Sequence, residues 1–503
     1  MKYLLGYDIG SSSVKASLLS IATGRCVAAA TSPATELEIA APQTGWAEQH
    51  PERWWQEVAH ATAQLKAAYP FDSTLIAGIG ISYQMHGLVL LNKSGQVLRP
   101  AIIWCDRRAV AYGNQAFADL GEAYCLANFL NSPGNFTASK LKWVRENEPA
   151  LYAQVHKIQL PGDYIAYKLT GQLQTTVSGL SEAVLWNFRR QALAQELLDY
   201  YGLCADLLPE MVDTFGVQGQ LSAAAAQELG LTAGTPISYR AGDQPTNAFA
   251  LGVLQAGEVA ASAGTSGVIY GISETATADP RSRVNACVHV NSTPEQPKNG
   301  MLLCVNGTGI LNSWLRKIVG VLPYDQLNHL AAQAPVGAAG LLFLPFGNGA
   351  ERMLENRPAA AELRGLNFNV HGRAHLLRAA QEGIAFALNY GLDILRATGV
   401  PVHQVRAGNA GLFRSPVFRE AFVNTSNVEL RLYNTDGAQG AARGAGVGVG
   451  VYASPAEAFA GLEQLLTVEP TADLRQQYRV AYARWQEAVL PLTINPNASA
   501  HGA

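Results

Sequence analysis

The segment YDIGSSSVKAS, residues 7–17, sets an acid and three hydroxyl side chains between two apolar runs. Residues 2–7 and 14–20 have the length and composition of β-strands, and the turn ATGR leads to a third strand at residues 26–31. The first strand delivers Asp8 to a turn whose glycine and hydroxyls can present N–H and O–H donors to an anion. The segment therefore predicts three strands joined by tight turns, with donors suited to phosphate oxygens at the first turn.

The elements after these strands alternate in type. Residues 54–69 predict a helix, and residues 75–82 and 88–92 predict strands around the loop YQMHG. After Asp243 the same order begins again, because a strand at residues 258–263 leads into a second turn of glycine and hydroxyls, GTS. Alternating strands and helices are typical of α/β proteins, and the repeated turn predicts a second domain built like the first.

Length and composition limit the architecture and the kind of ligand. A chain of 503 residues is too long for one ordinary core, which predicts two domains with a boundary near residues 245–255. The 36 basic and 39 acidic residues leave a formal charge of −3, which argues against nucleic acid or a membrane as partner. Scattered cysteines, no signal peptide and no apolar run of about 18 residues predict a cytoplasmic protein.

Two patterns in the second half are predicted to be structural. The helix predicted at residues 371–398 carries apolar residues at every third or fourth position, which is the spacing of a buried face. The segment AARGAGVGVGV, residues 441–451, lacks the GxGxxG spacing of a dinucleotide-binding loop and does not follow a clear strand. A tightly packed helix of small residues is preferred over such a loop.

Three roles are open for Asp243 in the segment RAGDQPTN, residues 240–247. It could cap a helix that begins at Pro245, hold a metal ion, or accept a proton from a substrate. Mg²⁺ needs only one or two carboxylates together with phosphates, and Asp8 beside the donor-rich turn already meets that need. The alternative for Asp8 is an Asx turn that closes a hairpin. The cap and the base remain open for Asp243.

Two more glycine-containing turns follow apolar segments, in SAGTSGV at residues 262–268 and VRAGNAGLFRS at residues 405–415. Two such turns could grip a polyphosphate from both sides. The chain contains no GxxxxGK[ST], so a P-loop NTPase is excluded.

Taken in order, DIGSSSVK, GDQ, GTS and a late glycine turn resemble the sugar kinases of the actin-like ATPase superfamily, specifically the FGGY carbohydrate kinase family. The resemblance runs from residue 3 to about residue 450. It implies a two-domain α/β fold of the actin-like ATPase (ribonuclease H-like) type, each domain a mixed sheet flanked by helices, with the active site in the interdomain cleft. Further family marks are GWAEQHPERWW (45–55), AIIWCDRRA (101–109), TASKLKWVREN (137–147) and LLRAAQEGIAF (376–386).

On this resemblance, residues 1–248 form the N-terminal FGGY kinase domain, which holds the sugar site and the first phosphate turn. Residues 249–490 form the C-terminal domain with the nucleotide site, and residues 491–503 form a tail. The resemblance alone also implies a homodimer.

Within the family, the sugar site separates the members. The segment ISYQMHGLVLL, residues 81–91, resembles the QMHG segment of xylulose kinases, whereas glycerol kinases carry an Arg-Glu pair at the positions of Met85 and His86. Met-His-Gly offers a slim apolar wall, backbone groups and one imidazole. On the residues alone, His86 is equally well explained as a hydrogen-bonded core histidine. The resemblance assigns Met85, His86 and Gly87 to sugar binding.

Trp104 could be a core tryptophan or a flat apolar face for the carbon side of a sugar, and we expect a pocket wall. Asp106 ahead of Arg107 looks like a helix cap, and we leave it as either a structural residue or one that supports a residue of the pocket. Lys140, Trp143 and Glu382 also belong to family marks, and we assign them to packing.

The resemblance implies a role for each remaining residue. Asp243 is the base that accepts the proton of the 5-hydroxyl of a ketopentose, Gln244 hydrogen-bonds the sugar, and Asp8 serves Mg²⁺. Many xylulose kinases have three glycines where this chain has Ala407, Gly408 and Asn409, which leaves the nucleotide base preference open. The residues assigned to ATP are Gly10, Ser11, Ser12, Ser13 and Lys15 in the first turn, Gly264 and Thr265 in the second, and Gly309, Gly408 and Asn409.

The expected activity is ATP-dependent phosphorylation of D-xylulose at the 5-hydroxyl, which would give D-xylulose 5-phosphate in xylose catabolism and feed the pentose phosphate pathway. A kinase for another ketose or polyol, such as ribulose or sedoheptulose, is the alternative within this class. A sugar sensor that keeps the fold without turnover is the alternative from another class. Asp8 and Asp243 together argue against a sensor, since a pure binder has no use for a base.

Overall fold

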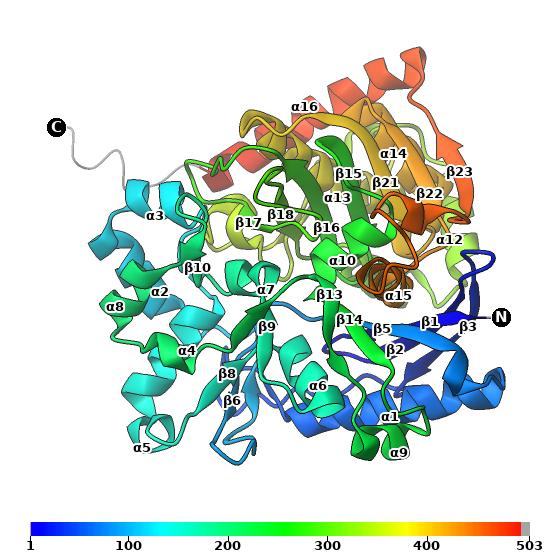
Figure 1. Cartoon of the computed structure of the whole chain (residues 1–503). Coiled ribbons are helices and arrows are strands. Elements are labelled where there is room, and N and C mark those ends of the chain that lie inside the picture. Colours follow the sequence, from blue (N-terminus) through cyan, green and yellow to red (C-terminus); the bar gives the residue numbers. More distant parts are fainter. Residues whose placement is uncertain (1, 494–503) are drawn as a thin grey trace.

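The computed structural model describes residues 2–493. The first half of the chain is built on a six-stranded mixed sheet, which lies in the lower part of Figure 1. The strand order is β13-β14-β5-β1-β2-β3. The central strands β1, β5 and β14 run parallel, and the outer pairs are antiparallel. The strands are β1 (Tyr3–Ile9), β2 (Val14–Ser20), β3 (Cys26–Ser32), β5 (Ile76–Tyr83), β13 (Phe215–Gln220) and β14 (Pro236–Gly242).

The second half repeats this topology. Its seven-stranded sheet has the order β17-β18-β16-β15-β21-β22-β23, with β15, β21 and β22 parallel and the other pairs antiparallel. Six of these strands match the first sheet in order and direction, so the predicted second domain built like the first is confirmed. The strands are β15 (Gly257–Ala263), β16 (Gly267–Ser273), β17 (Asn285–Val288), β18 (Asn299–Val305), β21 (Val402–Gly408), β22 (Glu429–Tyr433) and β23 (Gln464–Val468).

Local chemistry explains where the predicted helix at residues 54–69 begins. The helix α1 (Pro51–Ala68) starts with a proline at its first position, and the His50 side chain accepts a hydrogen bond from the backbone N–H of Glu52. Trp54, Trp55 and Val58 lie on its buried face. The helix therefore packs on the first sheet, against β2 and β3.

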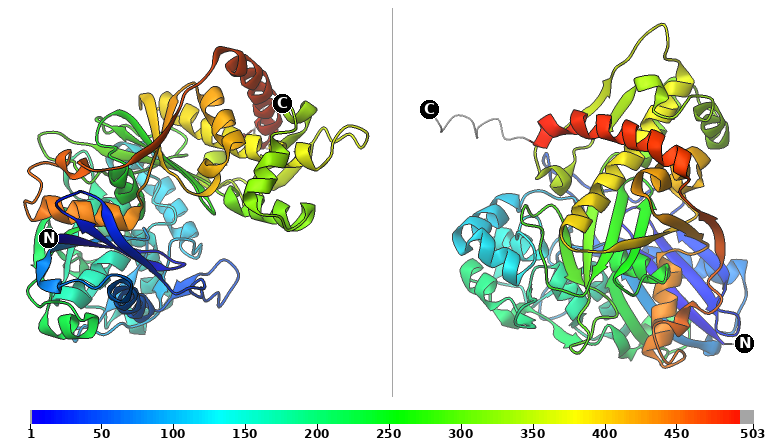
Figure 2. Two further views of the ribbon diagram at one scale, coloured as in Figure 1. Left: turned by 90° about the vertical axis from the view of Figure 1, so that its right-hand side faces the viewer. Right: turned by 90° about the horizontal axis from the view of Figure 1, so that it is seen from above.

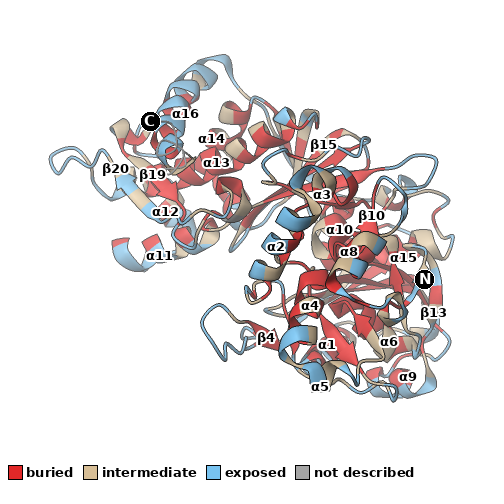
Figure 3. Cartoon of the chain, turned by 90° about the vertical axis from the view of Figure 1, so that its left-hand side faces the viewer, coloured by how far each residue is buried: buried red, intermediate tan, exposed pale blue. Residues whose placement is uncertain are grey.

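Smaller elements between β3 and β13 build out the first domain (Figure 3). The predicted strand at residues 88–92 is β6, which pairs with β8 outside the main sheet. These elements are β4 (Glu48–Gln49), β6 (Val89–Leu91), β7 (Ala101–Ile102), α2 (Val110–Leu120), α3 (Glu122–Asn128), α4 (Thr137–Asn147), α5 (Pro149–Tyr152), β8 (Lys157–Gln159), α6 (Pro161–Thr170), β9 (Gln174–Thr176), α7 (Val177–Glu182), β10 (Trp186–Asn187), β11 (Ala192–Leu193), α8 (Gln195–Tyr201) and β12 (Glu210–Val212); α9 (Ala223–Leu229) follows β13.

Helices of the second half cover its sheet, and the predicted helix at residues 371–398 is among them. It is α13 (Arg373–Ala397), and its apolar positions are buried as the spacing predicted. No helix that the structure describes is both long enough and apolar enough to cross a bilayer. The other elements are α11 (Gly309–Val319), α12 (Tyr324–Ala331), β19 (Leu342–Pro345), β20 (Ala361–Arg364), α14 (Pro416–Ser426) and α16 (Ala472–Thr493). The helix α16 includes the first three residues of the predicted tail, and residues 494–503 of that tail lie outside the described part of the chain.

Two helices lie where the halves meet. The helix α10 (Asp243–Ala250) leads from β14 towards β15, and α15 (Gly437–Gly448), although late in the chain, packs on β1, β5 and β14 of the first sheet. Figure 2 shows this orange helix beside the blue strands. The prediction of a packed helix of small residues at 441–451 is confirmed, but the helix begins earlier, ends at Gly448, and does follow a strand, β22. The predicted domain limits stay a prediction.

Small residues allow α15 to approach the sheet closely, and this predicts an effect on stability. A methyl group added at Gly80 of β5 would lie 2.0 Å from the carbonyl oxygen of Ala441. Because backbone is rigid on both sides of this contact, we expect Gly80→Ala to lower the free energy of unfolding by about 1–3 kcal/mol. Thermal or urea unfolding measures this change. Gly216→Ala is the control, since its methyl group would meet Asp213 at an ordinary 3.5 Å; an equal loss in both variants would contradict the explanation.

Candidate active site

The predicted sugar and phosphate residues of the first half come together at one edge of its sheet. The parallel strands β1, β5 and β14 end at Ile9, Tyr83 and Gly242. The donor-rich turn, the loop Met85–Gly87 and Asp243 follow these three strand ends. Because parallel strands share one carboxyl edge, residues far apart in the chain become neighbours there, and this edge is where open α/β sheets bind ligands.

The first predicted phosphate turn is closed by its own backbone. The N–H of Gly10 donates to the carbonyl of Ser13 at 3.0 Å, and the indole Nε1–H of Trp104 donates to Ser11 Oγ at 3.3 Å. Trp104 is 37% exposed, so it is not a core tryptophan. Ser12 is exposed, and Lys15 stands directly opposite Asp8 in the β1–β2 pair. The turn thus brings hydroxyls, an ammonium group and an open aromatic face to one place.

Asp8 is half-buried at the end of β1, and one of its oxygens is already engaged. The hydroxyl of Ser82 donates to Asp8 Oδ1 at 2.7 Å. Burial raises the pKa of Asp8, Lys15 and the Ser82 hydrogen bond oppose this rise, and the charge of Asp436 adds to it. The other oxygen, Oδ2, faces Gly437 at the start of α15, where an added methyl group would lie 2.7 Å away.

Asp243 begins α10, which corrects one expectation from the sequence. The helix starts at Asp243 instead of Pro245, and Gly242 is its N-cap residue, so Asp243 is not the cap. A carboxylate in the first turn is still favoured by the helix dipole. Burial raises the pKa of Asp243 to about 7, the charge of Asp8 adds to the rise, and hydrogen bonds from Gln244 oppose it. A carboxyl group with this pKa can take up a proton at neutral pH.

The predicted sugar loop packs against the start of α6 through Gly87 and leaves the imidazole of His86 accessible. Met85 and Gly87 are buried, and Gly87 lies where a methyl group would be 2.5 Å from the Pro161 ring. The His86 side chain keeps 15% of its surface exposed. Burial lowers the pKa of His86 to about 3, and the nearby ammonium group of Lys140 contributes. His86 is therefore neutral at physiological pH, and it is the most accessible of these three residues.

The predicted nucleotide residues of the second half also come together. The parallel strands β15 and β21 end at Ala263 and Gly408, so the turns that follow lie at one edge. The Gly309 N–H donates to the carbonyl of Gly264 at 2.7 Å, and an added methyl group on Gly309 would lie 2.3 Å from that oxygen. Gly309 is thus required for close packing of α11 on the second turn. Gly264, Thr265 and Asn409 are exposed.

Asp436, which the sequence did not single out, connects the two halves. Asp436 caps α15, since its Oδ1 accepts the Gln439 N–H at 3.0 Å, and its charge acts on Asp8. Gly408 lies near the same segment, because an added methyl group would be 3.3 Å from the Thr435 carbonyl oxygen. An aspartate followed three residues later by glutamine is a capping pattern that could have indicated this helix start.

Asp106 is structural, but it does not cap a helix. It is fully buried, accepts the Ala47 N–H at 2.6 Å and pairs with Arg108 at 2.7 Å, whereas α2 begins only at Val110. This ion pair fixes the segment that carries Trp104.

The carboxylate of Asp8 and the nearby hydroxyls fit a single hard cation whose other ligands are phosphate oxygens. Within residues 2–493, no group of three or more His, Cys, Asp or Glu side chains is arranged to hold a metal by itself. Asp8 supplies one carboxylate beside the hydroxyl turn. Mg²⁺ needs little more when phosphate oxygens complete its coordination shell.

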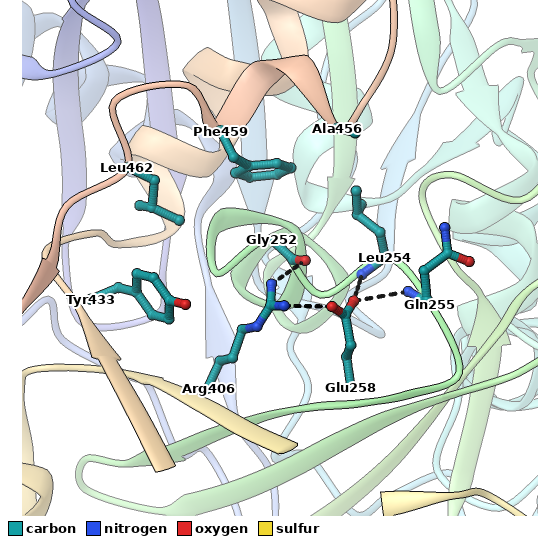
Figure 4. A pocket seen from close by; sticks show the side chains of 9 residues that line it. All are labelled: Gly252, Leu254, Gln255, Glu258, Arg406, Tyr433, Ala456, Phe459 and Leu462. Carbon is teal, nitrogen blue, oxygen red and sulfur yellow. Dashed lines mark hydrogen bonds and ion pairs between the residues drawn. The ribbon is translucent and has the colours of Figure 1, made fainter. Parts of the chain in front are cut away.

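A cavity of about 410 Å³ lies away from these residues, where the chain crosses between the two halves (Figure 4). Its polar groups satisfy one another: Arg406 donates to the Gly252 carbonyl at 2.6 Å and pairs with Glu258, which accepts the Leu254 N–H at 2.8 Å. None of the predicted site residues lines it.

Comparison with known proteins shows the family of the chain. Residues 3–250 match the N-terminal domain and residues 259–452 the C-terminal domain of the FGGY family of carbohydrate kinases. The chain is 31% identical to the xylulose kinase of Escherichia coli K12, over 97% of this chain and 99% of that protein. It is 29% identical to the L-xylulose/3-keto-L-gulonate kinase of the same strain, over 98% and 97%.

The crystal structure of a xyloylose kinase from Brucella ovis superposes with a TM-score of 0.86 and 30% identity, covering 97% of this chain and 99% of that one. This match confirms the predicted two-domain α/β fold. The chain is therefore a sugar kinase and belongs to the FGGY family of carbohydrate kinases.

Proposed function

We propose that this sugar kinase transfers the γ-phosphoryl group of ATP to the 5-hydroxyl of D-xylulose, giving D-xylulose 5-phosphate. The observation that carries the proposal is Asp243, a carboxyl group with a pKa near 7 at the same strand edge as the sugar loop and the phosphate turn. The nearly full-length similarity to a xylulose kinase supports the choice of sugar.

In this mechanism, Asp243 accepts the proton of the attacking hydroxyl, and Gln244 beside it orients the sugar. His86 offers a hydrogen bond to a sugar hydroxyl, and Trp104 presents an apolar face to the carbon side. Met85 and Gly87 shape the loop from within. Holding the hydroxyl in line with the γ-phosphate supplies much of the rate enhancement of such a transfer.

The phosphates would be held from both sheets. The residues that face them in this proposal are Gly10, Ser11, Ser12, Ser13 and Lys15 in the first half, and Gly264, Thr265, Gly309, Gly408 and Asn409 in the second. Asp8 would hold Mg²⁺, which when bound spreads the charge of the transferring phosphoryl group. The homodimer and the cytoplasmic location stay predictions.

The test is an ATP-coupled panel of ketopentoses, ketoheptoses and polyols, with ADP release as the readout. We expect D-xylulose to give the highest kcat/KM. A higher kcat/KM for ribulose, sedoheptulose or L-xylulose would change the proposed substrate but not the proposed kinase activity. L-Xylulose is included because the chain is similar to an L-xylulose/3-keto-L-gulonate kinase. Absence of sugar-stimulated ADP release with every sugar would favour the sensor.

The pKa of Asp243 predicts how activity depends on pH. Only the carboxylate form accepts a proton, so kcat/KM for the ketose should approach its full value well above pH 7 and should fall as the pH drops through about 7. Below the pKa we expect a loss of about tenfold per pH unit. Initial rates between about pH 5 and 9 measure this, with ATP affinity over the same range as control. A flat profile down to about pH 5 would contradict the assignment.

A further inference from the structure

The backbone at His86 adopts an unusual conformation. Its φ is 61°, in the left-handed region that residues other than glycine rarely occupy. Such a conformation persists only where the surroundings impose it, and it is concentrated at functional sites. His86 has this conformation in the loop that follows β5, at the strand edge that carries Asp243.

Two side chains from other elements hold both backbone groups of His86. Glu182 Oε2 on α7 accepts the His86 N–H at 2.9 Å, and Lys140 Nζ on α4 donates to the His86 carbonyl at 2.7 Å. Both are almost fully buried, where a carboxyl and an ammonium group cost free energy unless they are hydrogen-bonded. Lys140 also donates at 3.1 Å to the carbonyl of Ile103, the residue before Trp104. The clamp formed by Glu182 and Lys140 thus ties together two segments of the proposed sugar site.

The same contacts decide which nitrogen of the imidazole carries the proton. His86 Nδ1 lies 2.9 Å from the backbone carbonyl oxygen of Glu182, which can only accept, and 3.3 Å from Glu182 Oε2, the oxygen that accepts the His86 N–H. In a neutral ring, Nδ1 must therefore carry the hydrogen, and Nε2 is left as an acceptor. The ring also meets Phe136 edge-on, with centroids 4.8 Å apart, so its orientation is held from a second side.

The helix that carries Glu182 is itself fixed to the second domain. Ser178 Oγ donates to the Val288 carbonyl at 3.0 Å, and Ser181 Oγ accepts the Val288 N–H at 2.8 Å. Val288 ends β17, the edge strand of the second sheet. Glu182 is thus carried by a helix that is hydrogen-bonded to the second sheet, and such support is what positioning a binding group requires.

We infer that Glu182 and Lys140 are positioning residues that hold His86 in its left-handed conformation with Nδ1 protonated, so that Nε2 accepts a hydrogen bond from one hydroxyl of the sugar. This inference rests on the proposed function, since it places the sugar beside His86. It also assigns specificity: a site built to bond a hydroxyl rejects the analogue that lacks it.

Kinetics of three variants test the clamp. Glu182→Leu and Lys140→Met should each raise KM for the ketose about tenfold to a hundredfold, because a buried backbone group loses its partner. KM for ATP and the sugar-independent ATPase rate should change less than about twofold, within the scatter of distant substitutions. Glu182→Gln keeps an oxygen acceptor of the same size and should restore KM to within a few-fold of the parent. Should Glu182→Leu fail to fold, Lys140→Met carries the same test.

Glu382→Leu is the matched control, since Glu382 is a buried carboxyl paired with Arg378 at 2.8 Å on α13 of the second domain. It should lower thermal stability and leave KM for the ketose unchanged. Monodeoxy analogues of the ketose give a second readout. The parent should discriminate strongly against one of them, and Glu182→Leu should lose that discrimination. Equal rises of KM for ketose and ATP in Glu182→Leu would overturn the inference.

Histidine ¹⁵N spectra separate this inference from the proposed function. The His86 signals, identified by their loss in His86→Gly, should show the Nδ1–H form in the parent and a changed form in Glu182→Leu. If the parent phosphorylates no ketose, the proposed function fails, and the spectra still decide the clamp. If the parent is active but Glu182→Leu keeps both the parent tautomer and the parent KM for the ketose, only the clamp is wrong.

Discussion

Asp243→Asn is expected to reduce ketose phosphorylation about 10²–10⁴-fold, the usual contribution of a positioned base. An asparagine has nearly the same size, but its amide cannot accept the proton of the attacking hydroxyl. The substitution also removes the charge repulsion with Asp8 that adds to the raised pKa of Asp243. ATP binding should therefore be kept. ADP release in a coupled assay measures turnover, and calorimetry measures ATP affinity.

A second buried aspartate serves as a control for the general effect of replacing a buried carboxylate by an amide. Asp279 is 2% exposed and pairs with Arg283 at 2.7 Å in the second half, and it is not one of the proposed site residues. Asp279→Asn should lower stability while turnover stays near the parent value. Near-normal turnover in Asp243→Asn would contradict the assignment of Asp243 as the base. Its role would then be limited to the first turn of α10.

Asp8→Ala is expected to abolish metal-dependent use of ATP while sugar binding stays intact. A bound divalent cation supplies several kcal/mol of charge stabilisation in phosphoryl transfer, so a loss on the order of 10³-fold in kcat/KM for ATP is expected. The Ser82 hydroxyl, which donates to Asp8 at 2.7 Å, would lose its acceptor, so some loss of stability should accompany the effect. Mg²⁺ titrations of the ADP-release rate measure the change.

Glu57→Ala is the matched control for Asp8→Ala, because Glu57 is a buried acid of the same domain that accepts a hydrogen bond from the Ser32 hydroxyl at 2.6 Å. It should reduce stability without changing the Mg²⁺ dependence. A loss of ketose affinity in Asp8→Ala as large as the loss in ATP use would place Asp8 in the sugar site instead.

Much of the fold could be predicted because its signals are local. Strand length, tight turns and apolar spacing are contained in windows of ten to twenty residues, and β1, β2, β3 and α13 lie within a few residues of their predicted ranges. The repeat of strand and glycine-hydroxyl turn after Asp243 indicated a second domain built like the first. Helix starts were less accurate, as α10 and α15 show, because capping depends on backbone geometry at single residues.

The sequence alone determined which residue types reach the strand ends: an acid and hydroxyls after β1, an imidazole after β5 and a lone acid after β14. Only the tertiary structure decided how these groups act on one another. Glu182 and Lys140 reach His86 across 96 and 54 positions of the chain, and Asp436 is brought to Asp8 from the other half. Burial is likewise a property of the folded chain, so the raised pKa of Asp243 cannot be found in its neighbours in sequence.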